Sequence, residues 1–66
     1  MKLFIFKRKA DWDEFEGFAI TAKTIESAVA LREEASYHER GDWQLVFCEK
    51  VEHDKEEVLL EAYNAG

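Results

Sequence analysis

One segment of the chain combines residue types that suit recognition of a charged partner. Four carboxylates, those of Asp11, Asp13, Glu14 and Glu16, surround Trp12 within six residues. Tryptophan is enriched among the side chains that dominate the binding energy of protein interfaces. Trp12 would either anchor a partner here or fold back onto the domain and leave the carboxylates solvated. These residue types indicate binding rather than bond-breaking chemistry.

Metal-binding and catalytic roles do not fit the spacing of the available ligands. A calcium loop that began at Asp11 would need glycine sixth and glutamate twelfth, where this chain has Glu16 and Ala22. The single cysteine, Cys48, and the two histidines lack the paired close spacing of a structural zinc site. Cys48 is expected in the core, and a strand cysteine is usually inert. We expect no catalytic residue, no bound metal and no cofactor.

Length and composition indicate one small soluble domain over residues 1–66. The chain is 47% hydrophobic, which argues against intrinsic disorder. One cysteine cannot form an internal disulfide, so a reducing cytoplasm is the expected compartment. The apolar run Leu3–Phe6 is too short for a signal peptide, which needs roughly 7–15 apolar residues, or for a membrane span.

The charge is acidic and unevenly distributed along the chain. Fifteen acidic and nine basic residues give a net charge of −6. Four of the bases fall in the first nine residues, which leaves −10 over residues 10–66. DNA binding relies on cations that neutralise phosphates, so this protein should avoid nucleic acid and attract basic surfaces. The early basic cluster, Lys7–Lys9, would either contact phosphate or balance the acidic loop beside it, and the second role is simpler.

Two strands, a helix and two further strands would position these residues. The segments with strand character are Lys2–Arg8, Phe15–Lys23, Trp43–Glu52 and Val58–Tyr63. The last segment also fits a helical spacing, and a strand is favoured because it would complete a second hairpin. Alternation puts Phe4 and Phe6 on one face of the first strand, opposite Leu3 and Ile5. In the third strand it groups Trp43, Leu45, Phe47 and Val51.

The helix begins after Thr24, a good N-cap residue, and Gly41 is placed to end it after about sixteen residues. Helical periodicity of 100° per residue separates two faces. The face expected to pack on the sheet carries Ile25, Ala28, Val29, Leu31, Arg32 and Ala35. The opposite face carries Glu26, Ala30, Glu33, Glu34 and Tyr37.

These elements predict an α+β fold of type ββαββ. The expected arrangement is a four-stranded antiparallel sheet of order 2-1-3-4, numbered along the chain, with the helix on one face. Its two ends would be acidic, because hairpin loops and helix termini gather there. The sheet face without a helix stays open, so an assembly module that forms a homodimer through this face is the alternative role.

Four stretches resemble a group of short proteins encoded in phages and prophages. They are the opening Met1–Phe6, the Trp12–Phe15 turn, the Phe18–Ala22 strand and the closing Tyr63–Gly66. Most members of that group have no assigned function, and these motifs are structural. In size and charge the chain is also similar to anti-CRISPR inhibitors, some of which act as DNA mimics.

The resemblance and the charge together predict a phage-type inhibitor in the cytoplasm of a bacterial host. It would bind a protein with a basic DNA-binding surface, such as a CRISPR effector subunit, and block that surface with carboxylates that stand in for phosphates. No direct contact with nucleic acid or membrane is expected. The predicted contact residues are Asp11, Trp12, Asp13, Glu14, Glu16, Glu33, Glu34 and Tyr37.

Overall fold

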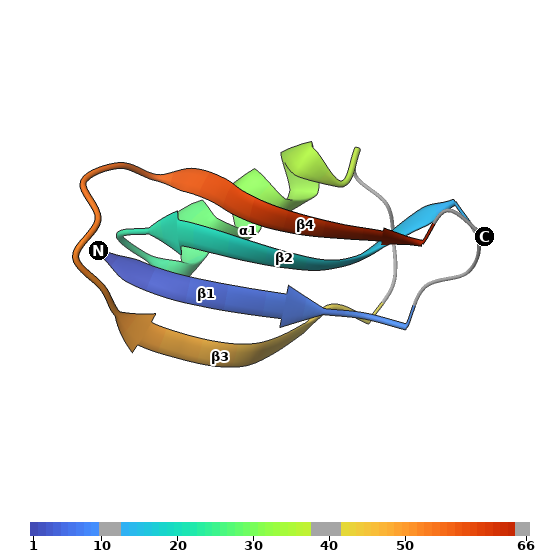
Figure 1. The fold of residues 1–66 in the computed structure, drawn as a ribbon, viewed down its shortest axis with the longest axis horizontal. Coiled ribbons are helices and arrows are strands. Elements are labelled where there is room, and N and C mark those ends of the chain that lie inside the picture. The colour runs from blue at the N-terminus through green and yellow to red at the C-terminus, as the bar shows by residue number, and fades with distance from the viewer. Residues whose placement is uncertain (10–12, 38–41, 65–66) are drawn as a thin grey trace.

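The chain folds into one antiparallel sheet with a helix on one of its faces (Figure 1). A computed structural model describes residues 1–9, 13–37 and 42–64. Its elements are β1 (Lys2–Lys7), β2 (Glu14–Ala22), α1 (Ile25–Ala35), β3 (Gln44–Lys50) and β4 (Glu57–Asn64). The predicted α+β class and ββαββ order are therefore confirmed, including the strand character of the last segment.

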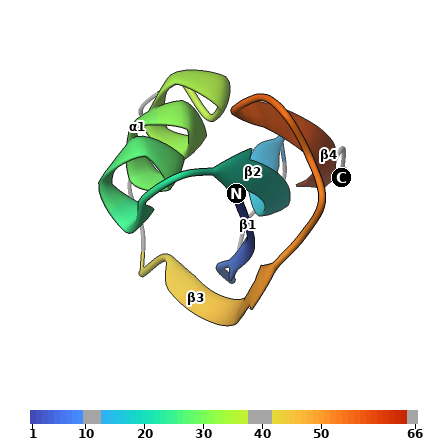
Figure 2. The same cartoon turned by 90° about the vertical axis from the view of Figure 1, so that its left-hand side faces the viewer.

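The position of β4 differs from the prediction. The strand order is β3-β1-β2-β4, so the expected order 2-1-3-4 was wrong in pairing the last strand with β3. Strand β1 does pair with both β2 and β3, but β4 pairs with β2. Residues 51–56 run from one edge of the sheet to the other past the ends of β1 and β2 (Figure 2).

Chain length and backbone hydrogen bonding explain this crossing. Six residues can span roughly 20 Å, more than the roughly 14 Å between the edge strands of a four-stranded sheet. Strand β2 has nine residues and β3 has seven. With β2 inside the sheet and the shorter β3 at an edge, more backbone N–H and C=O groups are paired.

The core lies between α1 and the face of the sheet that carries Phe4 and Phe6. These residues pair with Ile20 and Phe18 of β2, and all four side chains are at most 2% exposed. The predicted faces of the first strand are confirmed. The helix contributes Ala28, Val29, Leu31 and Ala35 to the same core. This shared apolar layer fixes α1 on one side of the sheet (Figure 2).

The helix begins as predicted and ends earlier. Thr24 is its N-cap, and the Thr24 hydroxyl accepts a hydrogen bond of 3.2 Å from a backbone N–H of the first turn. The last helical residue is Ala35, so the expected continuation to Gly41 was wrong, and Gly41 itself lies outside the described residues. Tyr37 adopts the left-handed φ of 54°, and its N–H donates to the Glu34 carbonyl at 3.1 Å. This bond satisfies a carbonyl of the final turn and stops the helix.

A β-bulge breaks the alternation of β3. The register of β1 and β3 shifts between Ile5 and Phe6, so Phe47 lies opposite Ile5 and Leu45 lies opposite Phe6. Directly paired residues share a face of a sheet. Phe47 and Leu45 therefore lie on opposite faces, and their predicted grouping was wrong. Cys48 is exposed rather than buried in the core as expected, because β3 is an edge strand and α1 lies over β2 and β4.

Two arginines contact Trp43. The guanidinium carbons of Arg8 and Arg32 each lie 5.2 Å from a Trp43 ring centroid. Arg8 also donates from Nε to the Phe15 carbonyl at 2.7 Å and pairs with Glu14 at 3.3 Å, which confirms for Arg8 the expected balance of the acidic loop. Burial lowers the pKa of Arg32. Two of the nine basic residues are thus held within the fold rather than presented to a partner.

Candidate functional site

The observed strand order separates acidic from basic residues across the molecule. Together β2, β4 and α1 carry seven acidic residues and one basic residue, whereas β1 and β3 carry three basic residues and one acidic. Strand β4 lies beside β2, and α1 packs over both (Figure 1). The acidic elements therefore form one continuous side of the molecule, here called the acidic side, in addition to the acidic ends that the sequence predicted.

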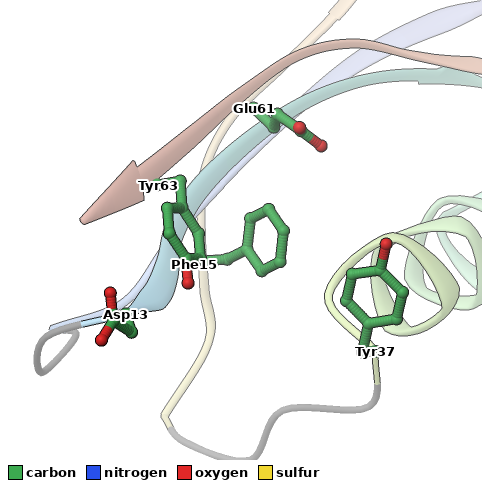
Figure 3. Close-up of a pocket in the computed structure, with 5 residues that line it drawn as sticks. All are labelled: Asp13, Phe15, Tyr37, Glu61 and Tyr63. Carbon is green, nitrogen blue, oxygen red and sulfur yellow. The ribbon is translucent and has the colours of Figure 1, made fainter. Parts of the chain in front are cut away.

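A hollow of about 550 Å³ opens on the acidic side, between the end of α1 and the strands β2 and β4. We call it the aromatic groove, and its lining residues are Asp13, Phe15, Tyr37, Glu61 and Tyr63 (Figure 3). An adjoining hollow shares two of these residues and adds Glu34 and Ala35. Three aromatic rings and three carboxylates thus come together at one end of the helix.

Phe15 is the centre of the aromatic cluster. Its ring centroid lies 4.8 Å from that of Tyr63, edge to face, and 6.1 Å from that of Tyr37. Strict alternation would place Phe15 and Phe18 on opposite faces of β2. A register shift between Phe15 and Gly17 brings both to the helix side, where their rings stack at 5.3 Å. The bulge therefore turns Phe15 toward the helix end and makes it the floor of the groove.

The backbone is left-handed at two residues that line the groove. Asp13 has φ 60° and Tyr37 has φ 54°. Aspartate is one of the few residues other than glycine that tolerate this conformation, whereas it costs an ordinary L-residue about 1–2 kcal/mol. The Tyr37 side chain is 81% exposed, so core packing does not account for a tyrosine at this position. A strained residue that presents a ring to solvent beside a hollow is typical of a functional position.

The electrostatics of the groove favour a cation. Asp13, Glu34 and Glu61 are all exposed carboxylates, and among the described residues those that line the groove include no base. The C-terminal end of α1, which carries the negative end of the helix dipole, is at the same place. Figure 3 shows the Glu61 carboxylate and the Tyr37 hydroxyl on the same side of the Phe15 ring. Aromatic faces and carboxylates together bind organic cations.

The structure gathers three of the eight predicted contact residues at this place. Asp13 and Tyr37 line the aromatic groove, and Glu34 lines the adjoining hollow. The three come from the turn before β2 and from the end of α1. Their proximity agrees with the expected meeting of the first hairpin loop and the helix C-terminus.

The other predicted contact residues are not part of the groove. Glu14 is only partly exposed and pairs with the buried Arg8, so it serves the fold. Glu16 and Glu33 are exposed on the acidic side and line neither hollow. Two lie outside the described residues: Asp11 and Trp12.

Sequence reasoning missed three residues of the groove: Phe15, Glu61 and Tyr63. Glu61 and Tyr63 belong to β4, which was expected beside β3 and therefore far from the first hairpin loop. Phe15 looked like an ordinary strand residue, because a bulge cannot be recognised from one strand alone. The nearest signal was an aromatic residue at the beginning of β2 and another at the end of β4, the arrangement expected of an antiparallel aromatic pair.

Comparisons with known proteins do not identify a function for this chain, so the function is inferred from the geometry of the site. No protein-family model, no curated protein and no solved structure matches this chain. The resemblance to phage-encoded proteins therefore stays a prediction. Within the described ranges, no helix is both long and apolar enough to cross a membrane. In the same part of the chain, no three His, Cys, Asp or Glu side chains gather as metal ligands.

Proposed function

We propose that this protein binds a basic surface of another protein through its acidic side and excludes nucleic acid from that surface. The proposed partner is a bacterial defence complex of the CRISPR type, which holds DNA in a positively charged channel. The observation that carries this proposal is the separation of charge, with seven acidic residues and one basic residue on β2, β4 and α1.

The dimensions of the molecule support a role in mimicking DNA. The fold is 34 Å long and 18 by 17 Å across. One turn of double-stranded DNA is about 34–36 Å long, so the molecule can occupy a channel over roughly one helical turn. Its carboxylates are carried by a helix and paired strands, which hold them in fixed positions. Complementary charge of this kind speeds association and makes binding sensitive to salt.

A competition assay tests the proposal. A purified CRISPR effector is loaded with fluorescently labelled target DNA, and displacement of the DNA by this protein is followed by fluorescence anisotropy in a salt series. We expect displacement that weakens steeply as salt rises. DNA that stays bound at low salt, with no complex between the two proteins, would reject the CRISPR-type effector as the partner.

Two matched variants show whether the position of the charges matters. The test variant reverses three exposed carboxylates of the acidic side, Asp13, Glu34 and Glu61, to lysine. The control variant makes the same change in net charge away from that side, at Glu49, Glu52 and Asp54, which are also exposed. The first should abolish displacement and the second should preserve most of it. Equal loss in both would mean that only net charge matters and that the acidic side is not the binding surface.

A second candidate function, assembly through the open sheet face, has its own observation. Phe47 and Leu60 are 43% and 69% exposed, and they pair with Ile5 and Ala19 on the face away from the helix. A second copy placed face to face would cover roughly 600 Å² on each chain, judged from the 34 by 18 Å outline, or about 1,200 Å² in total. That area is at the low end for a specific interface.

Light scattering at low and high salt tests this second function. Apolar contact predicts a dimer whose mass is insensitive to salt, and Leu60→Lys should convert it to a monomer without loss of helix signal in circular dichroism. A wild-type protein that remains monomeric at high concentration would exclude a dimer through this face. A dimer would be compatible with the first function, because the open sheet face lies opposite the face that carries α1 and the aromatic groove.

A further inference from the structure

We infer that the aromatic groove binds an arginine side chain of the protein partner. The inference deepens the proposed function, on which it rests for the identity of that partner. A basic DNA-binding surface presents arginine and lysine side chains to phosphates, and a protein that replaces DNA must receive some of them. The aromatic groove is the place on the acidic side where a cavity, aromatic rings and carboxylates coincide.

The aromatic rings provide surfaces on which a guanidinium group can stack. Tyr37 and Tyr63 both contact Phe15, with ring centroids 6.1 and 4.8 Å away, and the Phe15 ring lies between the two tyrosines (Figure 3). The fold already uses the same contact elsewhere. The guanidinium of Arg32 lies 5.1 Å from the Phe6 ring and 5.2 Å from a Trp43 ring.

The carboxylates provide the negative charge that orients the bound guanidinium group. Glu61 and Asp13 stand on opposite sides of the Phe15 ring (Figure 3), and Glu34 borders the adjoining hollow. A guanidinium stacked on one of these rings can donate hydrogen bonds from its fixed fork of N–H groups to the carboxylate on its own side of Phe15. The end of α1 adds the negative end of its dipole.

Arginine fits this groove better than lysine does. The hollow of about 550 Å³ is broad enough for a planar group on a long stem. Guanidinium is less strongly hydrated than ammonium and stacks on aromatic faces, so less free energy is lost when it leaves water. The ring of Tyr37 is 81% exposed and so offers a face on which a guanidinium can stack.

The test is an NMR titration of the intact chain with three blocked tripeptides that differ only in the central residue: Gly-Arg-Gly, Gly-Lys-Gly and Gly-citrulline-Gly. Citrulline has the shape of arginine without the charge. We expect the arginine peptide to bind most tightly and to shift the backbone amide signals of Tyr37, Glu61 and Tyr63. The lysine peptide should bind several-fold more weakly, and the citrulline peptide at least about tenfold more weakly, the loss expected for one charge-assisted hydrogen bond.

Three variants locate the site. Glu61→Gln should weaken arginine binding about tenfold, whereas Glu26→Gln, the same change at an exposed carboxylate in the first turn of α1, should leave it unchanged. Tyr37→Gly removes a ring while relaxing its backbone, so weaker binding by this variant cannot be ascribed to unfolding. Equal binding of the arginine and citrulline peptides, or equal effects of the two glutamine variants, would overturn the inference.

The titration also separates this inference from the proposed function. If the protein displaces DNA from the effector but the groove does not bind arginine, the inferred arginine site is rejected and the proposed function is retained. Arginine binding in the groove without displacement from any effector would support the arginine site and count against the proposed partner.

Discussion

Substitutions at Tyr37 can separate the cost of its backbone conformation from the value of its ring. Glycine and alanine both remove the ring, and only glycine relieves the left-handed φ of 54°. The N–H of residue 37 still donates to the Glu34 carbonyl in both variants, so the helix end is otherwise preserved. The difference in free energy of unfolding between Tyr37→Gly and Tyr37→Ala therefore measures the cost of the left-handed backbone at residue 37.

The expected magnitude follows from three contributions. The left-handed conformation costs an L-residue about 1–2 kcal/mol, a cost that alanine retains and glycine avoids. The greater freedom of glycine in the unfolded chain offsets about 0.5–1 kcal/mol of that gain. We expect Tyr37→Gly to exceed Tyr37→Ala in free energy of unfolding by about 0.5–1 kcal/mol. Because the tyrosine ring is 81% exposed, its loss costs little, and the glycine variant should be at least as stable as the wild type.

Urea denaturation followed by circular dichroism measures the difference directly. In a domain of this size, the expected difference in free energy of unfolding corresponds to a difference of roughly 2–8 °C in melting temperature. Ala30→Gly is the control, because Ala30 is exposed within α1 and glycine there should destabilise by about 1 kcal/mol, the opposite direction. Equal stability of the two Tyr37 variants would mean that residue 37 is not left-handed in solution, and the inference from strain to function would fail.

Three further substitutions test the fold by the same denaturation assay. Thr24→Ala removes the N-cap acceptor and should cost about 1 kcal/mol. Ile20→Val deletes one methylene from a side chain with no exposed surface and should cost about 0.5–1.5 kcal/mol, with an unchanged dependence on urea. Arg8→Lys keeps the charge but loses the Nε bond to the buried Phe15 carbonyl, so about 1–3 kcal/mol should be lost; a neutral result would mean that lysine replaces that bond.

The features that the sequence predicted correctly depend on neighbours within a few residues. Alternation separated Phe4 and Phe6 from Ile5, and the burial of the two phenylalanines confirms it. The start of the helix followed from Thr24, whose hydroxyl acts on the next turn. Strand periodicity and N-capping act over such short distances that a single segment contains all the information needed.

The predictions that were wrong concern features that depend on contacts between distant segments. The partner of β4 depends on backbone hydrogen bonds summed over the whole sheet, and no single strand carries that total. The bulges in β3 and β2 arise from pairing two strands, so neither sequence shows them alone. The helix ended at Ala35 instead of near Gly41, because the left-handed Tyr37 took the place expected of glycine.

The candidate site shows the same division between local and tertiary information. Residue order alone predicted an acidic chain with the elements ββαββ and singled out Asp13 and Tyr37, because composition, periodicity and residue type are properties of the chain. Only the tertiary structure joined them to Phe15, Glu61 and Tyr63, since this contact requires β4 to pair with β2. The same pairing placed the acidic strands together under the helix. The number of charged residues follows from the amino-acid composition, whereas their separation into an acidic and a basic side follows from the order of the strands.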